Sequence, residues 1–143
     1  MGQRIGGIFL LVVAVAVAVQ TVVEPLYHAS EEGQPYSPLW SVLDPLMVVA
    51  VAVGMLLAWL RKRAAGGGGR GSDAVTRAWL AANTWFYGLL AVAILLLWNW
   101  FNLLSPRFTA IGDETSSLVW IIIDTLLPLL LGSLGLSLLR RRE

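Results

Sequence analysis

The chain contains no cysteine, and it has one histidine, His28, among its 143 residues. The absence of cysteine excludes disulfides, thiolate metal sites and thiol chemistry. A single histidine excludes a haem or copper site with several histidine ligands from this chain. Charged residues are also scarce, because they make up 13% of the chain, about half the share in a typical soluble domain. This composition argues against a soluble protein.

Hydrophobic residues make up 57% of the chain and collect in four blocks. A run of about 18 or more apolar residues is typical of a bilayer-spanning helix. A strand is excluded because an open strand leaves its backbone groups unpaired in lipid. The sequence therefore predicts an all-α integral membrane protein, a single domain over residues 1–143 that folds as a four-transmembrane-helix bundle. The predicted helices cover residues 5–23, 38–60, 79–104 and 117–139.

The basic residues lie on one side of the predicted membrane. Nine of the ten precede the first helix, separate the second from the third, or follow the fourth. Because Lys and Arg concentrate in cytoplasmic loops, we expect a multi-pass protein of the cell membrane with both termini cytoplasmic. The other two loops are acidic and should face outward.

The loop over residues 61–72 contains the glycine-rich segment "AAGGGGRG". Such a composition is typical of a flexible linker. A glycine run can resemble a phosphate-binding loop, but here no strand precedes it and no Gly-Lys-Ser/Thr ends it. We therefore expect neither a nucleotide nor a nucleic acid as a partner.

One pattern, Ser-x-x-Trp-x-x-x-Asp, occurs twice, as "SPLWSVLD" at residues 37–44 and as "SLVWIIID" at residues 117–124. The two copies lie 80 residues apart, and a shift of 81 places Gly7 on Gly88 and Pro25 on Pro106. One interpretation is two tandem helical hairpins related by a pseudo-twofold axis along the membrane normal. The other is chance, since apolar sequences match easily. Both interpretations remain open at this point.

The strongly polar residues of the spans all lie in the half nearer the acidic loops. At 1.5 Å per residue, Asp44 and Asp124 would lie roughly 9 and 10 Å below the helix starts. An unpaired carboxylate at such a depth costs about 3 kcal/mol or more, so the sequence predicts a buried polar cluster, structural or ion-binding. The amides of Asn99 and Asn102 are the candidate partners of the carboxylates. The cluster consists of Asp44, Asp124, Asn99, Asn102 and Glu24.

The start of the second helix has two candidate N-caps. Asp44 precedes Pro45, a good cap arrangement, but it would leave too few residues to span a bilayer. Ser37 followed by Pro38 is an equally good start, and we favour it, with Asp44 inside the helix. For the third helix, Ser72 or Asp73 is the expected N-cap.

Tryptophans cluster near both predicted interfaces, where indoles commonly anchor helices at headgroup level. A pocket for a quinone, carotenoid or hydrocarbon beside Trp98 and Trp100 is the alternative. A further segment, residues 131–137, presents glycines and serines that favour close helix packing, within the bundle or against a partner. The expected anchors are Trp40, Trp98, Trp100, Trp120 and Trp59.

The sequence contains no nucleophile–base set and no cofactor motif, so we expect a protein that is not an enzyme and has no cofactor. The first hypothesis is a non-catalytic accessory subunit that packs in a larger membrane complex or a homo-oligomer. The alternative is a small channel or transporter for a cation or proton that uses Asp44 and Asp124. A weaker idea is an outward-facing metal site. Its candidate ligands are Glu24, His28, Glu31, Glu32 and Asp44.

Overall fold

The computed structural model describes residues 2–30, 36–66, 76–105 and 112–140. The described chain is all-helical, and each helix is long and apolar enough to cross a membrane. At 1.5 Å per residue the helices are about 39–42 Å long, which exceeds the ~30 Å hydrocarbon core of a bilayer. The expected all-α architecture with four candidate spans is thereby confirmed. The helices are α1 (Gly2–Tyr27), α2 (Trp40–Gly66), α3 (Arg77–Leu104) and α4 (Asp113–Arg140).

The start of α2 settles the position of Asp44. A turn precedes the helix, in which Trp40 N donates to Ser37 O at 3.1 Å and Leu39 N donates to Ser37 Oγ at 3.4 Å. Asp44 lies one turn inside α2, so it is not the N-cap. The Asp44 carboxylate therefore projects from within α2 rather than capping its first turn.

The start of α3 is capped by a threonine. Thr76 has extended backbone geometry, and its Oγ1 accepts a hydrogen bond of 3.1 Å from Trp79 N. Such a cap satisfies one of the free amides in the first helical turn. The expected caps Ser72 and Asp73 lie outside the described residues. Of the flexible loop expected over residues 61–72, residues 61–66 instead continue α2, and residues 67–72 lie outside the described residues.

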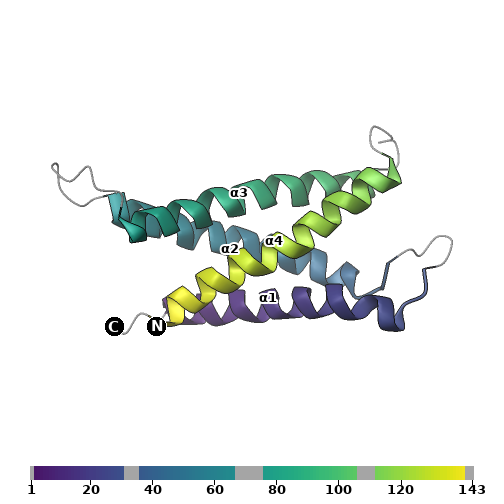
Figure 1. Ribbon diagram of the computed structural model, residues 1–143, viewed down its shortest axis with the longest axis horizontal. Helices are drawn as coiled ribbons and strands as arrows, with labels where there is room; N and C mark the ends of the chain where they lie inside the picture. The colour runs from purple at the N-terminus through teal and green to yellow at the C-terminus, as the bar shows by residue number, and fades with distance from the viewer. Residues whose placement is uncertain (1, 31–35, 67–75, 106–111, 141–143) are drawn as a thin grey trace.

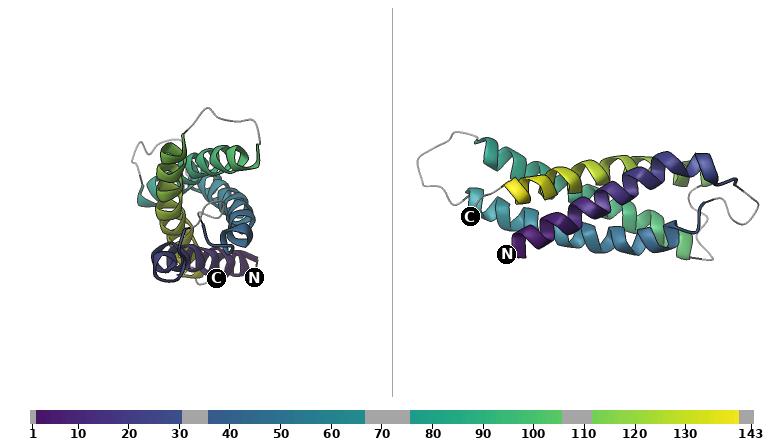
Figure 2. Two further views of the ribbon diagram at one scale, coloured as in Figure 1. Left: turned by 90° about the vertical axis from the view of Figure 1, so that its right-hand side faces the viewer. Right: turned by 90° about the horizontal axis from the view of Figure 1, so that it is seen from below.

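The helices form a crossed arrangement, with α1 and α3 on opposite sides and α2 and α4 crossing between them (Figures 1 and 2). Within the described residues α1 packs mainly on α4 and α2 mainly on α3, and α1 does not contact α3. We call the end where α1 and α3 finish and α2 and α4 begin the hairpin end. The opposite end, which holds Gly2 and Arg140, is the terminal end (Figure 1).

A glycine contact brings α1 and α4 together near the terminal end. A Cβ added to Gly135 would lie 2.8 Å from Gly7 O, and a Cβ added to Gly7 would lie 3.0 Å from Gly135 O. Glycine at both positions therefore allows the two backbones to touch. In this region the small-residue face of residues 131–137 is used within the bundle.

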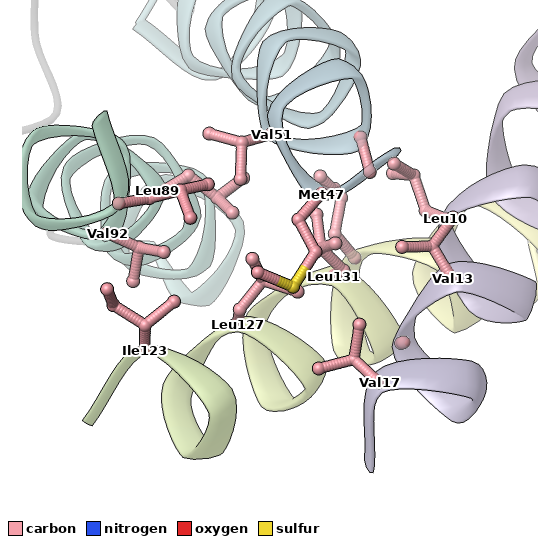
Figure 3. Packing of buried hydrophobic residues seen from close by; sticks show 14 of the residues in the cluster. Leu10, Val13, Val17, Met47, Val51, Leu89, Val92, Ile123, Leu127 and Leu131 are labelled. Atoms are coloured by element: carbon pink, nitrogen blue, oxygen red, sulfur yellow. The ribbon is translucent and has the colours of Figure 1, made fainter. Parts of the chain in front are cut away.

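The core positions recur at a fixed spacing along the chain, and several of their side chains meet between the helices in Figure 3. The buried positions Met47, Val51, Gly54 and Ala58 of α2 recur 80 residues later as Leu127, Leu131, Leu134 and Leu138 of α4. The buried positions Leu10, Val13, Val17 and Gln20 of α1 recur 79 residues later as Leu89, Val92, Leu96 and Asn99 of α3. The spacing of 81 expected for the first helices thus differs from the observed register, and Pro106 lies outside the described residues.

Candidate functional site: a carboxylate-lined cavity at the hairpin end

A cavity of about 260 Å³ lies at the hairpin end, where all four helices contribute to its lining. The Trp and Asp residues of both copies of the repeated pattern face this one cavity. The pattern therefore brings its functional groups to a single place, although its copies lie on different helices. The lining residues are Thr21, Glu24, Tyr36, Trp40, Asp44, Leu103, Ser117, Trp120, Ile121 and Asp124.

The two aspartates of the cavity are partly buried, and their carboxylates have no bonding partner among the described residues. Within the described chain, neither the Asp44 nor the Asp124 carboxylate makes a hydrogen bond or an ion pair. Oδ1 of Asp124 is fully buried and has no hydrogen-bonding partner among the described residues. Because a buried carboxylate needs hydration, a proton or a counter-ion, these two groups are available to a ligand.

The asparagines expected to pair with the aspartates are placed differently. Asn99 is fully buried and holds the first turns of α4, since its Nδ2 donates to Ser116 O at 3.1 Å. Its Oδ1 accepts from Ser116 Oγ, also at 3.1 Å. Asn102 is half-buried, and its Nδ2 has no partner among the described residues. The expected amide–carboxylate pairing is therefore not observed.

Glu24 links α1 to the start of α2. Its Oε1 accepts from Ser37 N at 2.6 Å, and its Oε2 accepts from the Trp40 indole nitrogen at 2.7 Å. Beside it, Gln20 Nε2 donates to Tyr27 Oη at 2.5 Å, and Tyr27 Oη donates to Ser37 Oγ at 3.0 Å. Both carboxylate oxygens of Glu24 are thus engaged in holding the first hairpin together.

Sequence reasoning missed the role of two carboxamides. Gln20 and Asn99 lie 79 residues apart at matching buried positions of α1 and α3. Gln20 reaches Ser37 through Tyr27, and Asn99 bonds directly to Ser116, so each carboxamide ties the first helix of its hairpin to the start of the second. A polar amide within an apolar run was the available signal, because such a group needs a buried partner.

The tryptophans divide into two groups by exposure. Trp120 is 8% exposed and lines the cavity with Trp40, rather than facing outward. Trp100 packs against the core and stacks on Phe101 with ring centroids 6.2 Å apart. Trp98 and Trp59 are 41% and 39% exposed. Of the five expected anchors, these two have the outward placement that contact with headgroups needs.

The helix core next to the cavity, on the side of the terminal end, is apolar. Met47 and Leu127 lie one turn beyond Asp44 and Asp124, and both are fully buried between the helices (Figure 3). The buried polar residues of the described chain are Gln20, Ser37 and Asn99, all at the hairpin end. From the cavity toward the terminal end, the described core offers apolar side chains and glycine.

The expected metal ligands do not gather in the described structure. Among the residues it covers, no group of three or more His, Cys, Asp or Glu side chains is placed to hold a metal ion. The carboxylate of Glu24 is bonded to Ser37 and Trp40, and His28 donates its backbone amide to Glu24 O at 2.9 Å. Glu31 and Glu32 lie outside the described residues.

No protein-family model matches the chain, and no curated protein or solved structure matches it.

Proposed function

We propose that this chain is a small non-catalytic membrane protein that binds a cation through Asp44 and Asp124 at the hairpin end. The supporting observation is that these two carboxylates face one cavity without a hydrogen-bonding or ionic partner in the described chain. Keeping them ionised without a partner is unfavourable in a membrane interior. A cation bound between them lowers this cost for both carboxylates, although a monovalent ion balances only one of the two charges, and this shared role accounts for the repetition of the costly residue.

The aromatic lining of the cavity supports a weakly hydrated cation. Trp40, Trp120 and Tyr36 line the cavity together with the carboxylates. Aromatic rings attract ammonium-type cations through their electron-rich faces, most strongly where water is excluded. Mg²⁺ gives up its water reluctantly and favours octahedral oxygen ligands. We therefore propose a monovalent cation, with small alkylammonium ions as the best-matched class.

The recurring burial pattern supports two tandem hairpins as the basis of the site. Equivalent positions are buried in α1 and α3 and in α2 and α4, and the main contacts join α1 to α4 and α2 to α3. A twofold axis along the membrane normal exchanges these two contacts. In this arrangement the two aspartates are equivalent ligands on the two crossing helices.

The charge distribution supports an orientation with the cavity facing outward. The described basic residues Arg4, Arg61, Lys62, Arg63, Arg77 and Arg140 belong to the terminal end, which we propose is cytoplasmic at the cell membrane. Because the chain has no cysteine, Ala29→Cys and Ala64→Cys can each be labelled singly. A membrane-impermeant maleimide applied to intact cells should label the first and not the second. The reverse pattern would refute the orientation.

Isothermal titration calorimetry of the full chain in lipid nanodiscs tests cation binding. We expect saturable binding of tetramethylammonium or Na⁺, and a loss of affinity of about tenfold or more in Asp44→Asn and in Asp124→Asn. Glu114→Gln is the matched control, since Glu114 is an exposed carboxylate of α4 outside the cavity lining. Its affinity should be unchanged. Wild-type protein that binds neither ion would overturn the proposal.

An accessory subunit is the second candidate, and the apolar helix core beyond the cavity favours it over a conducting channel. Met47 and Leu127, about one turn deeper than the aspartates, are fully buried in the apolar core, and the buried residues of the described chain toward the terminal end supply no polar side chain for a route across the membrane. Flux of ²²Na⁺ or of labelled tetramethylammonium into proteoliposomes separates the two roles. Flux that both Asp→Asn variants abolish identifies a channel or transporter. Binding without flux supports an accessory subunit in a larger complex or a homo-oligomer.

A further inference from the structure

An arginine joins α2 to α4 at the terminal end. Arg61 Nη1 donates to Ser137 Oγ at 2.6 Å, and Nη2 donates to Ser137 O at 3.1 Å. The guanidinium carbon lies 5.3 Å from the centroid of the Trp85 ring. Trp85 is itself fixed, because its indole nitrogen donates to Ser133 Oγ at 3.0 Å. Contacts with α3 and α4 therefore hold this guanidinium of α2 in one place.

Two neighbouring cavities lie beside this arginine. One has a volume of about 690 Å³ and contains Arg61 and Arg77 in its lining, and the other has about 480 Å³ and contains Arg140. They share Trp85 and Ser137. Alanines form much of the larger lining and leave room beside the charged groups. The remaining described lining residues are Ala64, Ala65, Ala78, Ala81 and Ala82 in one cavity, and Ser133 and Leu136 in the other.

The lining favours an anion. It contributes three guanidinium groups and the hydroxyl of Ser137, and its described residues include no aspartate or glutamate. The Ser133 hydroxyl is already used, since it donates to Leu130 O at 3.1 Å. Arginine matches the oxygens of a phosphate with paired N–H groups. A guanidinium already fixed by protein contacts loses little further freedom when it binds.

We propose that these two cavities form one site for the phosphate of an anionic phospholipid headgroup, held by Arg61, Arg77 and Arg140. The site lies at the terminal end of three candidate membrane-spanning helices, α2, α3 and α4. In a membrane this end would lie at the level of the lipid headgroups. Basic pockets between transmembrane helices at that level recognise anionic lipids. Leu136 is 43% exposed beside the smaller cavity and can contact an acyl chain. This inference is independent of the cation site.

Lys62 provides a matched control, because it neighbours Arg61 in sequence and has the same charge but lines neither cavity. Its Nζ donates to Tyr87 Oη at 2.7 Å and lies 4.8 Å from the Phe86 ring centroid. Lys62→Gln therefore removes one charge from the same end of the protein without changing the proposed site. Arg77→Gln and Arg140→Gln change the site, and neither removes the contact between Arg61 and Ser137.

Native mass spectrometry of the full chain in detergent tests the site with three ligands. These are phosphatidylglycerol, phosphatidylcholine with the same acyl chains, and inorganic phosphate. We expect phosphatidylglycerol to bind about tenfold or more tighter than phosphatidylcholine, with the preference weakened in Arg77→Gln and in Arg140→Gln, each of which removes one charge, and kept in Lys62→Gln. Inorganic phosphate should bind more weakly than phosphatidylglycerol.

Three outcomes would overturn the proposal. Equal binding of the two lipids would show that the site does not recognise headgroup charge. An equal loss in Lys62→Gln would show diffuse attraction to a basic surface instead of a defined site. Inorganic phosphate that binds as tightly as phosphatidylglycerol would assign the site to a free anion. Circular dichroism of each variant verifies that its helices are intact.

Discussion

The indole nitrogen of Trp40 donates a hydrogen bond of 2.7 Å to Oε2 of Glu24. This bond joins the last turn of α1 to the first residue of α2. The other carboxylate oxygen, Oε1, accepts a hydrogen bond of 2.6 Å from Ser37 N. Glu24 therefore differs from Asp44 and Asp124, which face the same cavity without such bonds to any described residue. One acidic residue of the cavity fastens the hairpin, and the other two remain available for a ligand.

Removal of the Glu24 carboxylate should destabilise the protein. Hydrogen bonds to charged groups contribute about 1.5–3 kcal/mol, so we expect Glu24→Ala to lower the free energy of unfolding by about that amount. Unfolding in mixed micelles by sodium dodecyl sulfate, followed by circular dichroism, measures the change. Glu114→Gln removes an exposed carboxylate and should have little effect. Equal stability of the two variants would contradict the fastening role.

Two glycines of α4 should respond differently to alanine. A Cβ at Gly135 would lie 2.8 Å from Gly7 O, whereas a Cβ at Gly132 would lie 3.7 Å from Ala14 Cβ, an ordinary contact. Overpacking costs about 1–3 kcal/mol, so Gly135→Ala should lower stability by that order. Gly132→Ala should be neutral or stabilising, because alanine favours a helix by about 1 kcal/mol over glycine. The same unfolding assay compares them, and matching losses would refute the close crossing of α1 and α4.

Asn99 and Asn102 share one helix face but should differ in importance. Asn99→Leu leaves Ser116 without its buried amide partner, and it should cost about 1–3 kcal/mol. Asn102→Leu removes an amide nitrogen that has no partner in the described chain, so stability should stay the same or rise. Thermal melting of the two variants in detergent decides the point. A larger loss at Asn102 than at Asn99 would be inconsistent with the structure.

Replacement of a cavity aspartate by leucine separates a structural role from a ligand-binding role. If Asp124 were an internal bond between helices, Asp124→Leu would destabilise the bundle. Because its Oδ1 is buried without a hydrogen-bonding partner in the part of the chain that the structure describes, we expect the leucine variant to gain up to about 3 kcal/mol in stability in the absence of the ligand cation. Unfolding in a buffer that contains neither Na⁺ nor alkylammonium ions measures this change in stability. A loss of stability would favour the structural role. Gain of stability with loss of binding is typical of functional residues.

The sequence was sufficient to predict the helices and their apolar character. Four long apolar blocks have no other stable form in lipid, and the repeated Trp and Asp marked the two helices that supply the aspartates of the cavity. The hydrogen-bonding partners were not predictable in the same way. A membrane helix is apolar on every side, so its pattern does not show which face meets a neighbour. The rotation of each helix about its own axis determines which face meets a neighbour. It explains why Asn99 reaches Ser116 while Asn102 does not, and why Trp120 faces inward while Trp98 is exposed.

The most direct test of the central claim uses the absence of native cysteine. Asp44→Cys and Asp124→Cys together place two thiols where the carboxylates face the cavity, and Cd²⁺ binds strongly when two thiolates from different helices can reach it. The ultraviolet absorbance of the Cd²⁺–thiolate bond reports this binding in nanodiscs. The proposed convergence of the two aspartates predicts that the double variant binds Cd²⁺ far more tightly than either single variant. A double variant that binds no better than the single ones would contradict it.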